Sequence, residues 1–416
     1  MQIGAHNQMQ KIQNPNISHL EYSTKVLLLI AALCVFSFDL IKLYNLWQLT
    51  PDGLTLGIKN EAKLPYWDFS NLWTDSLFAR EGHINWLFDM SLYRAKLDAF
   101  FQITLEPQEW SYPPHILLIG SPLSYLPIFP AYALWTLAGL AAFALSIRVF
   151  KFPPIIFVFV LLSPAIWKSL LLGQNGTFVT AILIAGLYYA PKKPILAEIL
   201  FGFLTMKPHL GILIPFILIA SRNWQAFLSA SITTILLVFS TYLLFGLAAW
   251  EGFFSATRPL MTLILEADFP APYHGNMITA FALARSLGAD LISSYGLQIM
   301  FSLGALSLAI WMWQPNREMS ETTRLIVTGL CVLITTPYAY TYDGAIYYVA
   351  IAWYLCHAKK PSAVPIFILW IAPLYWPQII SLGLPALGIF PLVVMVILLL
   401  KTDQSYSKAY AEKPLQ

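Results

Sequence analysis

The chain has 416 residues, of which 58% are hydrophobic and only 11% are charged, and its mean hydropathy is +0.65. Soluble domains carry about 25% charged residues, so this composition excludes an ordinary soluble protein and indicates an all-α polytopic membrane protein. The formal net charge of +3 is too small to indicate a nucleic-acid partner. Three cysteines, Cys34, Cys331 and Cys356, lie in apolar segments and show no disulfide or metal-ligand spacing.

The chain begins with a polar, Asn- and Gln-rich stretch, residues 1–25, which we interpret as a cytoplasmic tail. The apolar run from Val26 to Trp47 is longer than a signal-peptide core of about 7–15 residues, and no small-residue cleavage site follows it. We therefore expect this run to be a retained transmembrane helix.

The next segment, residues 48–112, has helical periodicity. Apolar residues recur at helical spacing in two stripes: Phe69, Leu72, Trp73 and Leu77, then Trp86, Met90, Tyr93, Leu97 and Phe100. Charged residues fall on the other faces: Asp75, Arg80, Asp89 and Lys96. The pattern predicts two amphipathic helices on the membrane surface, with Asp75 facing solvent.

Further apolar spans follow at 113–149, 152–172, 177–190, 195–220, 224–248, 296–313, 321–336, 344–357, 362–378 and 384–400. Prolines in 113–149 predict either one kinked span or a re-entrant piece and a span. Lys207-Pro208-His209 interrupts 195–220 and predicts two half-length helices. The total is about 12 transmembrane helices, ending near residue 401, with 402–416 as a second cytoplasmic tail.

Basic residues in the short connections predict the orientation. The pairs Arg148/Lys151, Lys192/Lys193 and Lys359/Lys360, with Arg222 and Arg317, should face the cytoplasm. The long segments 48–112 and 249–295 then form the first and second outer loops. Six polar clusters fall on the same outer side: PYWDF (65–69), WSYPP (110–114), GQNG (173–176), MKPH (206–209), YHGN (273–276) and YAYTYDG (338–344). One shared face is what an outward-facing active cavity predicts.

Asp68 is the main candidate for catalysis, because it lies between Trp67 and Phe69 at the predicted outer surface. It could be the N-cap of a helix that begins at Phe69. It could also be a general base, since a carboxylate among aromatic rings has a raised pKa. The residues alone leave both interpretations open.

The other clusters offer groups that bind phosphate or sugar. Lys207 could bind a lipid phosphate or could extend to the interface, GQNG could be a plain turn, and Asp343 could be a helix N-cap. The candidate binding residues are Lys207, His209, Gln174, Asn175, Arg258, Tyr112, His274, Asn276, Tyr342 and Asp343. We find no P-loop, HExxH or GxSxG motif and no ligand set for a divalent metal, so we expect neither a metal nor a cofactor.

The ordered series WDFSNLWTDSLFAREG…LFD, YPP…PLSYLP, LLLGQNG, LTMKPH, YHGNM and TTPYAYTYD resembles glycosyltransferase family 87 of the GT-C membrane enzymes. The resemblance runs from about Val26 to Leu400. It implies a transmembrane catalytic domain over 26–401, with juxtamembrane helices in the first outer loop. It also implies transfer of a hexose, with mannose favoured, from a polyprenyl-phosphate donor to a lipid or glycan acceptor.

The resemblance implies that Asp68 is the catalytic base, that Lys207 and His209 face the donor phosphate, and that Gln174 lines the cavity. The implied mechanism is inverting: Asp68 deprotonates an acceptor hydroxyl, which attacks the anomeric carbon opposite the phosphate, while Lys207 and Arg258 stabilise the departing charge. The expected location is the bacterial plasma membrane, with the site facing the periplasm or exterior. A transporter or flippase of a lipid-linked saccharide is the alternative, and it predicts inverted repeats and a midplane site. A third possibility, an O-antigen ligase or polymerase, predicts a large late outer loop with paired arginines.

Overall fold

The structure, a computed structural model, describes residues 22–48, 55–56, 62–63, 67–102, 104–105, 108–359 and 361–411. Residues 1–21 of the predicted N-terminal tail (1–25) lie outside the described residues. Within them, the strands are one antiparallel pair of two residues each, β1 (Thr55–Leu56) and β2 (Ala62–Lys63), with Thr55 opposite Lys63. The remaining elements are helices, which confirms the all-α class.

The first half of the chain forms α2 (Tyr22–Gln48), α3 (Trp67–Arg80), η1 (Ile84–Phe88), α4 (Met90–Phe101), η2 (Pro114–Ile116), α5 (Leu117–Leu123), α6 (Ile128–Ser146), η3 (Ile147–Phe150), α7 (Pro154–Leu161), α8 (Pro164–Leu172) and α9 (Gly176–Tyr189). The second half forms α10 (Pro194–Leu204), α11 (Pro208–Gly211), α12 (Ile214–Ala220), α13 (Trp224–Phe245), α14 (Leu247–Gly252), η4 (Phe253–Thr257), α15 (Arg258–Glu266), η5 (His274–Asn276), α16 (Ala280–Ser286), α17 (Leu291–Met312), α18 (Glu321–Thr335), η6 (Thr341–Asp343), α19 (Ala345–His357), α20 (Ala363–Ile371), η7 (Ala372–Leu374), α21 (Trp376–Ser381) and α22 (Ile389–Ala411).

Three helices of the described chain are long and apolar enough to cross a membrane: 128–150, 224–245 and 291–312. A fourth span is obtained if α7 and α8, which meet at a bend of 44°, are counted as one. Shorter apolar helices account for most of the other predicted spans. The structure therefore fits a membrane protein, but it does not confirm twelve crossings.

Prolines explain where the apolar segments break. Lys207 has φ −133° and ψ 71°, and Pro208 follows it as the first residue of α11, because a residue before proline is kept out of the helical region and proline suits a helix start. The segment 195–220 is thus two half-length pieces, as predicted. Pro127 likewise precedes α6, so the predicted span at 113–149 is split into the short α5 and the long α6.

The surface position predicted for α3 is wrong. Every residue from Phe69 to Ala79 is buried, and Asp75 has no exposed surface. The helix is covered because α5 and the 3-10 turn η1 pack against it, so its polar face meets protein and not water. The following helix, α4, is closer to the prediction, since Tyr93 and Leu97 are buried while Met90 and Phe100 are exposed.

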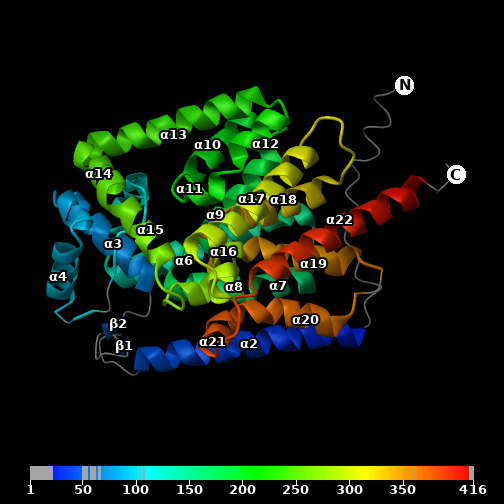
Figure 1. The fold of residues 1–416 in the computed structure, drawn as a ribbon, viewed down its shortest axis with the longest axis horizontal. Helices are drawn as coiled ribbons and strands as arrows, with labels where there is room; N and C mark the ends of the chain where they lie inside the picture. The colour runs from blue at the N-terminus through cyan, green and yellow to red at the C-terminus, as the bar shows by residue number, and fades with distance from the viewer. Residues whose placement is uncertain are drawn as a thin grey trace.

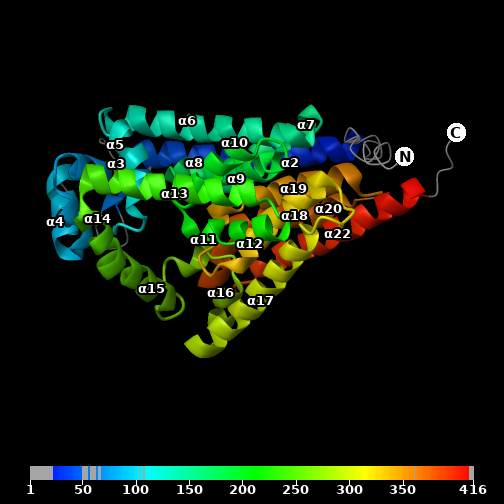
Figure 2. The same cartoon turned by 90° about the horizontal axis from the view of Figure 1, so that it is seen from above.

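The helices are arranged so that the start of α2 and the end of α22 lie at one end of the molecule, and α3 and α4 lie at the other (Figure 1). Turned by 90°, the same view shows α14 and α15 leaving the end of α13 and returning toward α16 (Figure 2). The two long predicted outer segments therefore flank one end region of the helix bundle. Helix α22 continues to Ala411, past the expected boundary at 401.

Candidate active site

Asp68 lies in the first turn of α3, which begins one residue earlier at Trp67. It is therefore inside the helix and is not the N-cap of a helix starting at Phe69. A carboxylate in the first helical turn is stabilised by the helix dipole. Its side chain is half-buried, unlike the fully buried residues that follow it.

The charge of Asp68 acts on three tyrosines that come from distant parts of the chain. Burial, and then Asp68, raise the pKa of Tyr112. Asp68 also contributes to the raised pKa values of Tyr340 and Tyr342, in which burial is the largest cause. Asp68 is thus close enough to the segment before η2 and to the turn around η6 for its charge to act on tyrosines of both.

The GQNG turn joins the same group. The Tyr112 hydroxyl donates to Gln174 Oε1 at 3.2 Å, and Lys207 Nζ donates to Asn175 Oδ1 at 3.2 Å. Both amides are nearly inaccessible to solvent. The two amides are therefore part of a closed polar cluster and not of an exposed turn.

The glycines of this turn allow the close approach. Gly173 has φ +69°, and a Cβ there would lie 2.3 Å from Phe69 Cβ. A Cβ on Gly176 would lie 2.1 Å from the backbone oxygen of Tyr342. Side chains at these two positions would separate the turn from α3 and from η6.

Lys207 and Asp343 form the charged centre of the cluster. Lys207 Nζ lies 2.5 Å from Asp343 Oδ1 and 5.0 Å from the centre of the Tyr342 ring. The lysine side chain is 7% exposed and the aspartate 0%, so Lys207 does not extend to the interface. Burial raises the pKa of Asp343, and the Lys207 ammonium acts in the opposite direction.

Asp343 is not a helix N-cap, since the N-cap of η6 is Tyr340 and that of α19 is Gly344, but it takes part in the capping of η6 as its third residue. Its Oδ2 accepts a hydrogen bond from the backbone N–H of Tyr340 at 3.2 Å, which closes the turn of η6. The carboxylate therefore holds the turn with one oxygen and Lys207 with the other.

Lys168 of α8 is a member of the cluster that the sequence analysis missed. Its Nζ donates to Asn276 Oδ1 at 2.7 Å and to Thr341 Oγ1 at 3.0 Å. It thereby connects η5 to η6, at the opposite end of the three-residue turn from the Lys207–Asp343 pair. A lysine inside an apolar run was the available signal, since such residues commonly serve function.

The remaining predicted residues lie around this cluster. His274 is fully buried, its Nδ1 accepts from Ala271 N at 3.0 Å and its Nε2 donates to the Leu265 carbonyl at 3.2 Å, so it is a neutral imidazole that organises its own loop. Arg258 is exposed at the start of α15, with its guanidinium 5.9 Å from the Phe254 ring. The His209 ring lies 5.9 Å from that of Tyr338.

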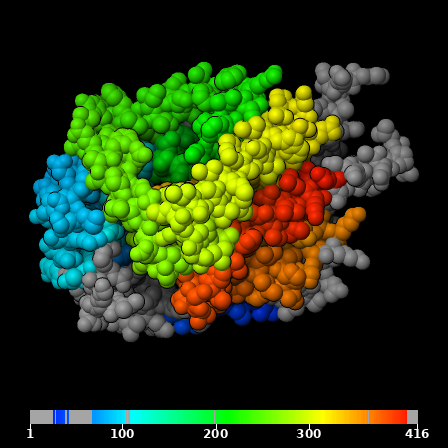
Figure 3. All heavy atoms as spheres, viewed as in Figure 1, coloured from blue at the N-terminus to red at the C-terminus, as the bar shows by residue number. Residues whose placement is uncertain are grey.

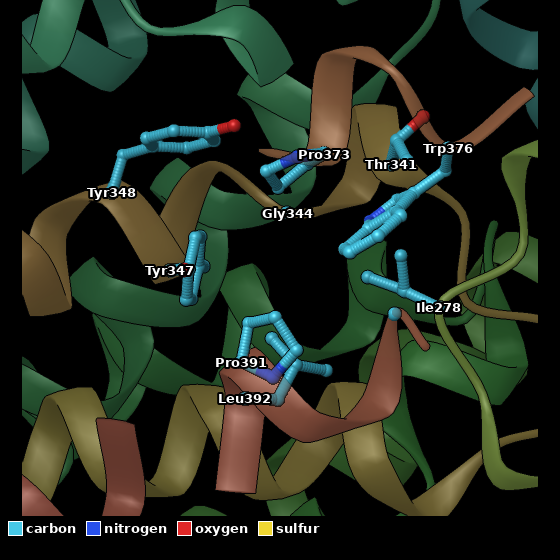
Figure 4. A pocket seen from close by; sticks show the side chains of 10 residues that line it. Ile278, Thr341, Gly344, Tyr347, Tyr348, Pro373, Trp376, Pro391 and Leu392 are labelled. Carbon is cyan, nitrogen blue, oxygen red and sulfur yellow. The ribbon is translucent and has the colours of Figure 1, made fainter. Parts of the chain in front are cut away.

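A small pocket lies next to η6 (Figure 4). It shares Thr341 and Gly344 with the turn, and its other walls are apolar and aromatic, including Tyr347, Tyr348 and Trp376. It contains none of the charged groups. Among the described residues no group of three His, Cys, Asp or Glu side chains lies close enough to hold a metal ion. The polar cluster, and not this pocket, is therefore the candidate active site.

The family model of glycosyltransferase family 87 matches residues 110–337, which is more than half of the chain. The chain belongs to glycosyltransferase family 87. This family consists of membrane glycosyltransferases, in agreement with the apolar helices. No match is found among curated proteins or among solved structures. The matched region contains Tyr112, Gln174, Lys168 and Lys207 but neither Asp68 nor Asp343.

Proposed function

We propose that this family 87 enzyme transfers a hexose, with mannose favoured, from a polyprenyl-phosphate donor to a lipid or glycan acceptor, with inversion at the anomeric carbon. Asp68 is the general base. The observation that carries the proposal is that Asp68 and the Lys207–Asp343 pair both act on Tyr342: the Asp68 charge contributes to its raised pKa, and the Lys207 ammonium lies over its ring.

This arrangement supports a base on the acceptor side and a cation on the donor side, because the Asp68 carboxylate and the Lys207 ammonium come from different segments and both act on Tyr342. In an inverting reaction the acceptor oxygen and the leaving group occupy opposite faces of the sugar. Tyr112 and Tyr342 would line the space that holds the sugar. A phosphate leaves without protonation by a second acid, so one carboxylate is enough for the acceptor side.

The cations support the donor side. Lys207 and Lys168 hold the two ends of η6, and either ammonium could stabilise the charge that develops on a departing phosphate. Asp343 neutralises the charge of Lys207 in the described structure. The positive charge of Lys168 is therefore important for stabilising a departing phosphate. We assign both lysines to the donor phosphate, and Gln174 and Asn175 to hydroxyls of the sugar.

A hollow on the molecular surface supports a lipid donor. Figure 3 shows this face hollowed between the green helices that include α13 and the yellow helix α17, with α11 and α12 between them. The helices around the hollow expose large apolar side chains: Ile212, Phe216, Ile219, Ile235, Phe239, Ile299, Met300 and Leu303. Helix α11 begins directly after Lys207, so a polyprenyl chain lying here would have its phosphate near that lysine.

The location is part of the proposal. We propose a bacterial plasma membrane enzyme with its site on the periplasmic or exterior side. The basic connections predict that both chain ends are cytoplasmic, and α3 lies at the opposite end of the molecule from the start of α2 (Figure 1). Labelling of a cysteine introduced at position 68 from the outer side would agree with this orientation.

The test is turnover of a polyprenyl-phosphate mannose donor by purified protein. Asp68→Asn should lower turnover by about 10²- to 10⁴-fold, the range for loss of a general base, with little change in thermal stability. The matched control is Asp89→Asn: Asp89 caps α4 from an exposed position, and asparagine caps equally well. Full turnover in Asp68→Asn would exclude Asp68 as the base. Saccharide movement without glycosidic transfer would instead favour a transporter.

A further inference from the structure

A second aspartate of α3, Asp75, lies seven residues after Asp68 and therefore on the same side of the helix. It has no exposed surface and lies beside the apolar cluster that includes Leu72, Tyr93 and Trp110. Neither of its oxygens accepts a well-formed hydrogen bond from any described residue. A buried carboxylate without such donors is costly, so its charge state needs an explanation.

The hydrogen bonds around Tyr93 supply that explanation. The Tyr93 hydroxyl is next to the Asp75 carboxyl, yet it donates its single hydrogen to Asn71 Oδ1. The Tyr93 oxygen is then available to Asp75 only as an acceptor, and only a protonated carboxyl can donate to it. Burial raises the pKa of Asp75 well above its ordinary value, while Tyr93 acts in the opposite direction.

The chain of hydrogen bonds ends at the active-site loop. Asn71 Nδ2 donates to the backbone oxygen of Glu109 at 2.9 Å. Beside it, Gln108 Nε2 donates to the backbone oxygen of Trp67 at 2.8 Å. Residues 108 and 109 are thus hydrogen-bonded to α3 shortly before Tyr112, on which the charge of Asp68 acts.

We propose that Asp75 is a protonated positioning residue whose carboxyl hydrogen is donated to the Tyr93 hydroxyl. Tyr93 in turn donates to Asn71, and Asn71 donates to the backbone oxygen of Glu109. This chain of hydrogen bonds fixes the Tyr112 segment against α3. The inference rests on the proposed function only for its effect on turnover. The protonation and the hydrogen-bond chain concern α3, α4 and residues 108–110, and they are measurable without substrate.

Few charged groups surround Asp75. Glu109 acts on Tyr93 and is paired with Arg94 of α4, and Arg80 follows Asp75 on α3. Of the other elements that pack on α3, α5 and η1 carry no titratable side chain, α6 contributes Tyr132 at the Phe69 end, and α8 contributes Lys168. Burial is therefore the main cause of the preference of Asp75 for the neutral form.

The pH dependence has a definite sign. The folded-state pKa of Asp75 is above its unfolded value, so its contribution to stability is full below the unfolded pKa and is lost as pH rises through the folded pKa. Asparagine has the same shape and donates to Tyr93 without titrating. Asp75→Asn should therefore melt at a higher temperature than the wild type at neutral pH, with a gap that widens as the pH rises from the ordinary carboxyl range toward the raised folded-state pKa of Asp75.

Two measurements test the proposal. The infrared difference spectrum of wild type minus Asp75→Asn at neutral pH should contain a carboxylic-acid C=O band, and a carboxylate band instead would overturn it. In turnover assays, Asp75→Asn should remain within about threefold of the wild type, whereas Asp75→Leu and Tyr93→Phe should each lower kcat, and their double variant should be no worse than either single one.

The outcomes separate this inference from the proposed function. A lower melting temperature or failure to fold in Asp75→Asn would overturn the neutral assignment, as would additive losses in the double variant. If Asp68→Asn keeps its activity, the base assignment fails, but the infrared band and the melting temperatures still decide the state of Asp75.

Discussion

The two ends of the turn η6 are each held by a lysine, and the lysines differ in what they hold. Lys207 is almost fully buried and pairs with the carboxylate of Asp343 at 2.5 Å. Lys168 is half-buried and donates to the neutral oxygens of Asn276 and Thr341. One end of the turn thus contains an ion pair, and at the other end the lysine donates to an amide oxygen and a hydroxyl oxygen.

The difference bears on function. Two buried charges compensate each other's lost hydration, so the Lys207–Asp343 pair is coupled to the fold as well as to the chemistry. Hydrogen bonds to neutral oxygens cost less to exchange for a ligand's oxygens. We therefore expect Lys207 to be required for an intact site, and Lys168 to affect donor binding more than stability.

The largest effect is expected from breaking the charged end. Lys207→Met leaves Asp343 buried without its partner and should cost about 3–5 kcal/mol in unfolding free energy, with loss of turnover. The double variant Lys207→Met/Asp343→Leu removes both charges and should recover much of the stability while remaining inactive. Melting temperature in detergent and donor turnover are the two readouts. A double variant less stable than Lys207→Met would show that the ion pair is not what links Lys207 to the fold.

A change at the contact between the GQNG turn and η6 should have an intermediate effect. Gly176→Ala places a methyl group 2.1 Å from the Tyr342 backbone oxygen, which cannot yield like a flexible side chain. We expect a loss of about 1–3 kcal/mol, typical of overpacking, and lowered turnover because the turn moves away from Lys207.

Gly304→Ala is the control for this substitution. Gly304 lies in the interior of α17, and a Cβ there meets nothing within 4 Å. It should leave turnover unchanged and raise stability slightly, since alanine favours a helix by roughly 1 kcal/mol over glycine. If Gly176→Ala and Gly304→Ala have the same turnover and stability, the close contact at Gly176 is relieved without moving η6.

The sequence predicts the local breaks and turns of the polar cluster better than the contacts between its segments. Pro208 in an apolar run marks a break, and Gly173 and Gly176 mark a turn, because these residues restrict the backbone locally. Lys168 was missed because nothing local relates it to Asn276, 108 residues later. Its role depends on helices that are brought together by packing.

Asp75 is a second case in which packing decided what the local sequence could not predict. Periodicity separates the faces of α3 but does not say what covers them, and both faces are covered here. The predicted solvent-facing aspartate therefore became a buried one. The predicted twelve crossings are not confirmed for a related reason: short, proline-broken helices of the described chain have apolar composition without the length of a full bilayer span.

The smallest effect on stability is expected at the neutral end of η6, where donor binding should change most. Lys168→Gln keeps a hydrogen-bond donor but removes the charge, so the loss in unfolding free energy should be about 1 kcal/mol, the value of an ordinary hydrogen bond. If Lys168 meets the donor phosphate, the donor KM should rise by about 10- to 100-fold, which corresponds to ~1.5–3 kcal/mol for a hydrogen bond between charged groups.

Asn276→Ala is the matched control, because it removes one oxygen that Lys168 contacts and leaves the charge in place. Its donor KM should change by only a few-fold, and Lys168→Arg should recover part of the donor affinity lost in Lys168→Gln. An unchanged KM in Lys168→Gln with a large loss of stability would reverse the comparison, making Lys168 a structural link between η5 and η6 and leaving Lys207 as the cation for the phosphate.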